Sequence, residues 1–339
     1  HRNAAIAQAI KKYINSTEDY GFLENKGIKI LIAISRFWKQ RVNFSKELNK
    51  YVILGVTGPN EYENNVDNNW YTNYSARWCL EYTIEQLSEI AIRTNVSNEF
   101  ILKTNNLTIT EISSWKKIIK NMHLPFSKDL NVFIQNDGFL NKDLQSIDSI
   151  PLNQRPINQN WSWDKILRSP YIKQADVLQG FYFFEDHFSK SELEINFNYY
   201  EQFTVHESSL SACIHSILAS RINNIEKAYN YFIRASRLDL DDYNKEIRQG
   251  LHITSMGGSW MSIVEGFAGI RVFENKLYLN TKIPNNWDSY SFKLNIKNRK
   301  INILINKNET KIDLLSGQKI DVILNDCELT LNPKAIKIN

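Results

Sequence analysis

Apolar residues recur three and four positions apart from His1 to about Phe267, the spacing of helices that bury one face. Caps such as Ser16, Thr17 and Asp19 separate these periodic segments. The pattern predicts helices over residues 3–14, about 20–38, 68–92, 112–122, 172–188, 208–220, 225–238 and 255–267.

Between residues 128 and 170 the periodicity stops, and Asn, Asp and Pro punctuate the chain. A connection of this length is unusual in a simple helical bundle and favours a loop that covers a functional site. After Gly269, short alternating runs at 276–279, 290–296, 300–305 and 311–314 predict antiparallel strands. We therefore expect a mainly α fold, with a helical domain over 1–269 and a small β domain over 270–339.

Charge adds little to this picture. The chain has 41 basic and 37 acidic residues, a dispersed excess of +4 that favours neither a nucleic-acid nor a membrane surface.

No long apolar run predicts a membrane helix. Because Cys79, Cys213 and Cys327 lack metal-ligand spacing, we expect buried, reduced thiols in a cytoplasmic protein. Because the chain opens on His1 inside an apolar helical pattern, we also expect a truncated start.

The densest polar segment covers residues 55–73. Gly58 and Pro59 predict a tight turn, which Glu61 and Glu63 follow. Aromatic neighbours in sequence would partly desolvate Glu61 and raise its pKa, as a general acid near neutral pH requires; they are Tyr62, Trp70 and Tyr71. A solvated turn followed by a helix cap at Asp67 or Asn68 is the alternative, and the residues alone leave it open.

Lys173 and Gln174 form a second polar group at the predicted start of a helix. Both side chains can donate hydrogen bonds to sugar hydroxyls, and Asp176 offers a helix cap or a local partner. An ordinary surface position is the alternative for this pair.

Two further segments offer anion sites at helix entrances. His206, Ser208 and Ser209 open one helix, where hydroxyls and free backbone N–H groups can bind an anion. Around the second entrance, Gly257 and Gly258 permit a close approach of the backbone to a ligand. The other candidates there are His252, Ser255 and Ser259. A serine cap and a plain glycine turn remain the respective alternatives.

The run Gly-Pro-Asn-Glu-Tyr-Glu-Asn-Asn-Val-Asp-Asn-Asn-Trp-Tyr-Thr-Asn over residues 58–73 resembles the acid-bearing loop of glycoside hydrolase family 65, most of all in its maltose-type phosphorylases. The resemblance implies that Glu61 is the general acid, whereas Glu63 stands where the family varies. It implies that Lys173 and Gln174 hold the non-reducing glucose. For phosphate it implies His206, Ser208, Ser209, His252, Gly257 and Gly258.

The resemblance further implies the second half of an (α/α)6 barrel followed by a small C-terminal β domain. The implied reaction is inverting phosphorolysis of a disaccharide, maltose favoured, to β-glucose 1-phosphate and glucose. It needs inorganic phosphate as co-substrate, neither metal nor organic cofactor, and in the full-length protein a homodimer. Because phosphate is already an anionic nucleophile, one carboxylic acid and an anion site suffice.

Two other functions stay open. A hydrolase of the same family would use a carboxylate as base, and Glu207 is the candidate. A non-catalytic carbohydrate-binding protein is the other alternative. Residues 245–249, Lys-Glu-Ile-Arg-Gln, differ from an acidic run common in the family. The resemblance also implies that the loop that discriminates disaccharides lies upstream of the segment that matches His1. Since an open half-barrel exposes apolar inner faces, we expect the chain alone to be unstable or inactive.

Overall fold

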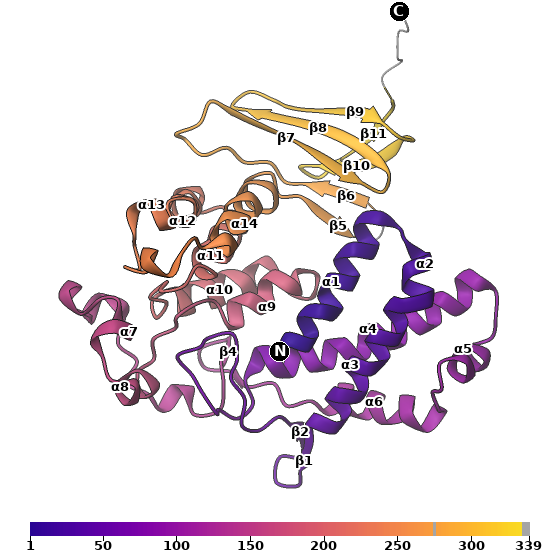
Figure 1. The fold of residues 1–339 in the computed structure, drawn as a ribbon, viewed down its shortest axis with the longest axis horizontal. Helices are drawn as coiled ribbons and strands as arrows, with labels where there is room; N and C mark the ends of the chain where they lie inside the picture. The colour runs from indigo at the N-terminus through magenta and orange to yellow at the C-terminus, as the bar shows by residue number, and fades with distance from the viewer. Residues whose placement is uncertain (274–275, 334–339) are drawn as a thin grey trace, which may run out of the picture. The chain divides into compact units, whose positions relative to one another are not determined.

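The computed structural model describes residues 1–273 and 276–333 and divides them into two compact units (Figure 1). The first unit comprises residues 1–14, 19–187 and 198–205, and the second comprises 15–18, 188–197 and 206–339. The chain is mainly helical up to residue 267 and forms strands after it, which confirms the predicted fold class. In the described residues no helix is both long and apolar enough to cross a membrane.

The first unit is built around a long central helix, α4 (Trp70–Thr94), which is buried on most of its surface. Its remaining regular elements are α1 (Arg2–Thr17, whose last residues lie in the second unit), α2 (Tyr20–Phe22), η1 (Leu23–Gly27), α3 (Ile28–Arg41), β1 (Asn43–Ser45), β2 (Lys50–Val52), α5 (Asn98–Thr104), α6 (Ile109–Asn121), β3 (Phe126–Ser127), β4 (Val132–Phe133), η2 (Phe139–Asn141), η3 (Ile147–Ser149), η4 (Leu152–Gln154), α7 (Ile157–Asn160), α8 (Trp163–Arg168), α9 (Val177–Phe183) and η5 (Glu185–His187).

Aromatic packing fixes α4 against α9. The Trp70 ring stacks on Phe133, with centroids 4.8 Å apart, and on Phe181, with centroids 6.2 Å apart. Gly180 makes this approach possible, because a Cβ atom there would lie 2.4 Å from the Trp70 ring. On the other side, the Ser35 hydroxyl of α3 donates to the Thr83 hydroxyl of α4 at 2.8 Å. The start of α4 is therefore held by close contacts from several segments.

The helices of the second unit surround α11 (Ser211–Arg221), in which residues 211–220 are all buried. The others are α10 (Lys190–Glu201, whose last turn belongs to the first unit), α12 (Ile225–Ser236), α13 (Leu238–Asp241), η6 (Ile247–Gln249), α14 (Ile253–Met261) and η7 (Ser262–Phe267). A Cβ atom on Gly258 would lie 2.6 Å from Cβ of Cys213, so α14 packs directly on α11.

The β part of the second unit holds two sheets. One has the order β11-β10-β6-β5 and the other the order β7-β8-β9. Their strands are β5 (Arg271–Phe273), β6 (Lys276–Leu279), β7 (Ser289–Ile296), β8 (Arg299–Asn306), β9 (Thr310–Ser316), β10 (Ile320–Leu324) and β11 (Cys327–Leu331). Alternating residues such as Ile301, Ile303 and Val322 are buried in one core with Val264 and Ala268.

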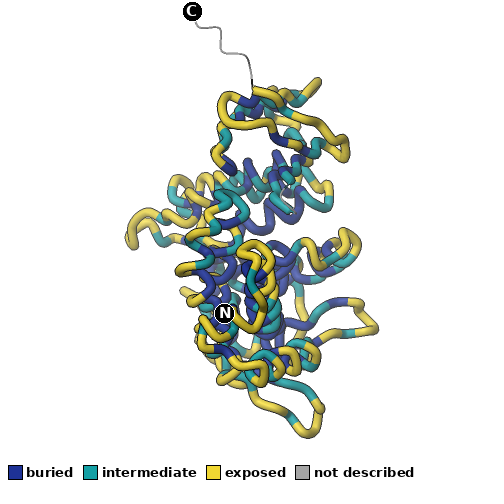
Figure 2. The backbone as a smooth tube through the Cα atoms, turned by 90° about the vertical axis from the view of Figure 1, so that its right-hand side faces the viewer, coloured by how far each residue is buried: buried dark blue, intermediate teal, exposed yellow. Residues whose placement is uncertain are grey.

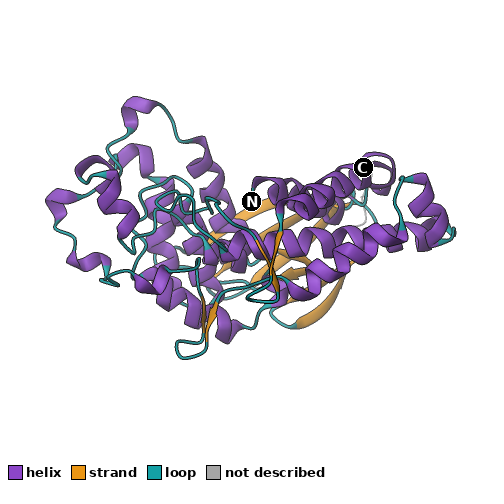
Figure 3. Ribbon diagram, turned by 90° about the horizontal axis from the view of Figure 1, so that it is seen from below, coloured by secondary structure: helices purple, strands orange, loops and turns teal. Residues whose placement is uncertain are grey.

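Several local predictions need correction. Not every strand pair is antiparallel, because β6 and β10 pair in parallel, with Val322 opposite Leu277. The predicted helix 172–188 is shorter, since α9 ends at Phe183. Cys79 and Cys213 are buried as expected, but Cys327 is exposed. Figure 2 shows how burial varies along the backbone, and Figure 3 shows how much of the chain is loop.

We predict that Gly180→Ala destabilises the first unit by about 1–3 kcal/mol, because the added methyl group collides with the fixed Trp70 ring. Gly21→Ala is the matched control, since its Cβ would meet only Asp19 Oδ1 at 3.6 Å, an ordinary contact. Urea unfolding followed by fluorescence measures both. Equal unfolding midpoints for the two variants would contradict the packing role of Gly180.

Candidate active site

The segment that carries Glu61 is a closed loop at the entrance to α4. Val56 and Val66 form an antiparallel bridge at its base, with both N–O distances 2.9 Å. Asn65 and Asn68 have φ angles of 53° and 54°, in the left-handed region that Asn tolerates better than most residues. The Asn-rich composition therefore follows from the backbone geometry of the loop.

Both ends of this loop are tied to regular structure. The side-chain oxygen of Asn68 accepts a hydrogen bond from the backbone N–H of Ile53 at 3.1 Å. Asn69 caps α4 by accepting from the backbone N–H of Thr72 at 2.9 Å. The helix cap expected at Asp67 or Asn68 therefore falls one residue later, at Asn69, on the same loop that carries Glu61.

Glu61 lies at the tip of the loop and is paired with Lys173. The Lys173 Nζ atom donates to Glu61 Oε2 at 2.7 Å, and the two side chains are 23% and 52% exposed, respectively. Gln174 is buried and donates from Nε2 to the carbonyl oxygen of Pro59 at 2.8 Å. The structure thus brings together the three residues predicted for acid catalysis and sugar binding.

The predicted rise in the pKa of Glu61 is wrong: in the structure this pKa is lowered. Partial burial by itself raises this pKa, but the hydrogen bond and charge of Lys173, with help from Gln174 and Arg2, outweigh it and lower the pKa. The aromatic neighbours in sequence pack elsewhere: Tyr62 and Tyr71 are buried, and Trp70 stacks in the core. Glu61 is therefore held as a carboxylate.

Glu63 has a structural environment unlike that of Glu61. It is 6% exposed, and burial raises its pKa, while the charge and hydrogen bond of Lys142 oppose that rise. Lys142 Nζ donates to Glu63 and also to the carbonyl oxygens of Leu167 and Ser169, at 3.0 and 2.9 Å. Lys142 therefore ties the acid loop to the long connection over 128–170, a role that no sequence pattern indicated.

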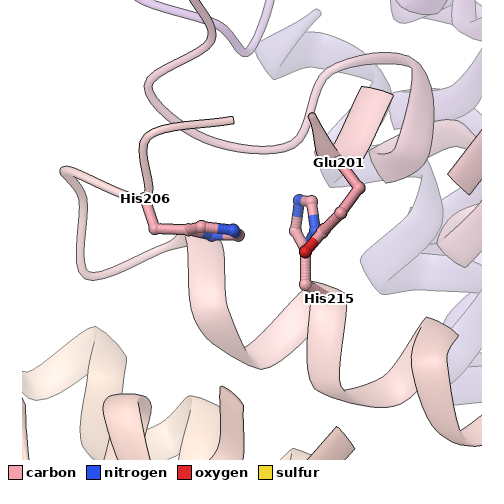
Figure 4. A group of neighbouring side chains, drawn as sticks. All are labelled: Glu201, His206 and His215. Carbon is pink, nitrogen blue, oxygen red and sulfur yellow. The ribbon is translucent and has the colours of Figure 1, made fainter. Parts of the chain in front are cut away.

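His206 lies in the second unit and is fully engaged there. Its ring contacts the Ser211 hydroxyl at 2.8 Å and the Tyr231 hydroxyl at 3.1 Å, and it meets the His215 ring edge to face at 4.5 Å (Figure 4). Burial lowers the pKa of His206 well below its ordinary value, and the charges of Arg234 and Lys227 add to the effect. The His206 ring is therefore neutral near neutral pH and brings no positive charge to this segment.

Ser208 and Ser209 precede α11 instead of belonging to it, since the helix begins at Ser211. Both are partly exposed, and the Ser208 hydroxyl accepts from the backbone N–H of Leu210 at 3.2 Å. No side chain caps α11. Glu207, the alternative base, is buried beside these serines, with 4% exposure.

His252 occupies the N-terminal end of α14 and is paired with Asp239. Its ring Nδ1 lies 2.5 Å from Asp239 Oδ1, and its backbone N–H donates to Asp239 Oδ2 at 2.9 Å. The hydrogen bonds from His252 lower the pKa of Asp239. The ring is therefore oriented by the Asp239 carboxylate, and its Nε2 atom lies 3.9 Å from the carboxylate of Glu246.

The two glycines of α14 have different surroundings. Gly258 is buried against Cys213 and is required by helix packing, whereas a Cβ on exposed Gly257 would meet nothing within 4 Å. The nearby hydroxyls of Ser255 and Ser259 donate to the carbonyl oxygens of Ala235 and Ser255, at 2.7 and 2.8 Å. Of these two glycines, only Gly257 therefore has open space around its backbone.

Comparison with known proteins identifies the family. Residues 1–261 match the model of the glycosyl hydrolase family 65 central catalytic domain, and residues 270–331 match the model of its C-terminal domain. The chain therefore belongs to glycoside hydrolase family 65.

The relatives with curated functions are phosphorylases. The chain is 50% identical over 322 residues to a maltose phosphorylase of Bacillus subtilis (strain 168), covering 94% of this chain and 41% of that protein. It is 40% identical over 338 residues to an alpha,alpha-trehalose phosphorylase of Thermoanaerobacter brockii, covering 99% and 44%. A solved structure, a putative kojibiose phosphorylase from human microbiome, superposes with a TM-score of 0.89 at 34% identity, covering 98% and 44%. The chain spans less than half the length of these relatives.

We predict that Lys173→Met raises the pKa of Glu61, because the hydrogen bond and the charge that lower it are removed together. The folded-state pKa lies below the ordinary value, so the pair stabilises the folded chain above that value, and this contribution is lost as pH falls through the lowered pKa. In the variant, the free energy of unfolding should therefore fall less steeply as pH decreases through this range.

Carbon-13 NMR of labelled glutamate measures this pKa. Lys165→Met, which removes an exposed lysine on α8, is the matched control and should leave Glu61 unchanged. An unchanged titration of Glu61 in Lys173→Met would show that the ion pair is not formed in solution.

Proposed function

We propose that this chain carries the general acid, the sugar-binding pair and the phosphate-binding segments of an inverting disaccharide phosphorylase. The observation that supports this most directly is the placement of Glu61 beside Lys173 and Gln174 on a loop anchored to α4. The relatives support phosphorolysis over hydrolysis, since the proteins named above are phosphorylases.

In the proposed reaction, protonated Glu61 donates its proton to the glycosidic oxygen as the bond from that oxygen to the anomeric carbon breaks. Phosphate attacks the anomeric carbon from the opposite face, and the electron pair of the broken bond stays with the leaving glucose. Phosphate needs no protein base, so Glu207 has no proton to remove. Glu61 is reprotonated from solvent before the next cycle.

Lys173 links sugar binding to acid catalysis in this proposal. The hydrogen bond and charge of Lys173 lower the pKa of Glu61 and so favour its ionised form. A sugar hydroxyl that accepts a hydrogen bond from Lys173 Nζ competes with this carboxylate, and the bound sugar excludes water from it. Both changes raise the pKa of Glu61, so substrate binding itself favours the protonated acid.

For the anion, we propose the two segments that meet through the packing of α14 on α11. The residues are His206, Ser208 and Ser209 on one side and His252, Gly257 and Gly258 on the other. The uncapped start of α11 contributes backbone N–H groups, exposed Gly257 lets the anion approach α14 closely, and neutral His206 orients its segment. The imidazolium form of His252, with Nδ1–H on Asp239, contributes an Nε2–H group. Gly258 acts through packing alone.

Maltose is the proposed substrate because the maltose phosphorylase shares the highest identity among the relatives named above. We extend the proposal to the architecture: residues 1–269 as part of an (α/α)6 barrel, residues 270–339 as its β domain, and a homodimer of the full-length protein.

An apolar face on the second unit supports a requirement for further chain. Leu251, Ile253, Met256 and Trp260 lie on and just before α14 and are 70%, 68%, 48% and 55% exposed. Contiguous apolar surface of this kind marks an interaction site. We propose that the portion of the relatives' length that this chain does not span covers this face.

We predict that Glu61→Gln abolishes phosphorolysis, with kcat lower by at least about a thousandfold, because an amide cannot donate the required proton. The assay measures β-glucose 1-phosphate from maltose, for this chain joined to the preceding region of the Bacillus subtilis relative. Glu99→Gln, an exposed position on α5, is the control and should retain activity. Glucose release that continues without phosphate would refute phosphorolysis and favour the hydrolase.

We also predict that one substitution affects the chain alone and this hybrid differently. Ile253→Ser should leave the free energy of unfolding of the chain alone nearly unchanged, because Ile253 is already exposed. In the hybrid it should cost about 1.5–3 kcal/mol, the value of a buried isoleucine. Leu152→Ser, at an 84% exposed position in the first unit, should be neutral in both proteins. Equal effects of Ile253→Ser in both would contradict a covered α14 face.

A further inference from the structure

Asp176 is buried, and its carboxylate accepts hydrogen bonds from residues that are distant in the sequence. It lies at the start of α9, where the sequence suggested a cap or a local partner, yet its side chain makes no capping hydrogen bond. Its Oδ2 atom instead accepts from the backbone N–H of Asn60 at 2.9 Å, and its Oδ1 atom accepts from Asn69 Nδ2 at 2.9 Å. Both partners lie more than 100 residues away, on the acid loop.

The side chain of Asn60 in turn binds Tyr62, which follows Glu61, and Lys173, the partner of Glu61. Its side chain is wholly buried, and its Oδ1 atom accepts from the backbone N–H of Lys173 at 2.9 Å and from that of Tyr62 at 3.2 Å. The loop is therefore held to the segment that supplies Lys173 on both sides of Glu61, through the Asn60 N–H before the acid and the Tyr62 N–H after it.

The loop is pressed closely onto the carboxylate. A Cβ atom at Gly58 would lie 2.5 Å from Asp176 Oδ2 and 2.4 Å from Asn69 Nδ2, so only glycine permits this approach. Asn69 caps α4 with its side-chain oxygen, which connects Asp176 through one amide group to the central helix.

A buried carboxylate without a salt-bridge partner is costly unless hydrogen bonds satisfy it. Burial raises the pKa of Asp176 to about 7, although the donors Asn60 and Asn69 oppose the rise. An asparagine at this position would carry no charge, but its NH2 group would face one of the two N–H donors of Asn60 and Asn69. Two donors cannot form a hydrogen bond with each other. The site therefore uses the only short side chain with two acceptor oxygens.

We propose that Asp176 is a positioning residue for acid catalysis: it fixes the backbone around Glu61 so that the acid stays within reach of Lys173 and of the glycosidic oxygen. Asp176 touches neither substrate nor the transferred proton. This inference rests on the proposed function only for its effect on turnover; the geometric effect on Glu61 is independent of it.

Asp176→Asn tests the proposal, with Asp67→Asn as the matched control. Asp67 is exposed on the same loop and accepts from the backbone N–H of Gly55 at 2.8 Å, remote from the peptides beside Glu61. In Asp176→Asn we expect the Glu61 pKa to rise toward its ordinary value and the Asn60 amide to exchange about tenfold faster or more. In the hybrid, kcat should fall about tenfold to a hundredfold while the KM for phosphate changes little.

Gly58→Ala gives an independent test with Asp176 intact, because the methyl group forces the loop away from the carboxylate. It should reproduce the rise in the Glu61 pKa and the faster Asn60 exchange, whereas Asp67→Asn should show neither. The proposal is overturned if Asp176→Asn and Gly58→Ala lower only the melting temperature and leave Glu61 and Asn60 as in the control. If both signatures occur but no protein phosphorolyses a disaccharide, the positioning role stands and the proposed function fails.

Discussion

The acid loop depends on one buried amide oxygen, the Oδ1 atom of Asn60. It accepts hydrogen bonds from the backbones of Tyr62 and Lys173, two positions 111 residues apart in sequence. Together with the bonds from Gln174 to Pro59 and from Asn60 to Asp176, it holds the loop against the segment that supplies Lys173 and Gln174. The ion pair at Glu61 is therefore a consequence of backbone anchoring, since an exposed pair alone contributes little to stability.

Periodicity in the sequence was sufficient to predict most of the helices and four of the strands, because each depends on residues close in the chain. It failed where the partner is distant. The parallel pairing of β6 with β10 depends on which strands meet, and alternation within a strand does not encode that. The short helix α9 illustrates a second limit, because its aromatic continuation packs against α4 without remaining helical.

In the candidate site, too, the sequence predicted what residues close in the chain determine and missed the contacts that only the folded structure makes. The resemblance of the loop over 58–73 located Glu61, but the direction of its pKa shift depends on Lys173, which tertiary structure brings to it. Lys142 and Asp176 anchor this loop from segments whose sequence carries no mark of that role. For Gly258 the sequence suggested a role beside a ligand, whereas the structure explains this glycine by its close contact with Cys213.

Burial also determines the chemistry of the thiols. Burial raises the pKa of Cys213 to about 11 and that of Cys79 to about 12, so both stay protonated and poorly nucleophilic near neutral pH. Cys327, on β11, is exposed. A maleimide or other thiol-directed label therefore reacts selectively at Cys327, which places a spectroscopic probe on the β part of the chain without engineering the acid loop or the α11–α14 contact.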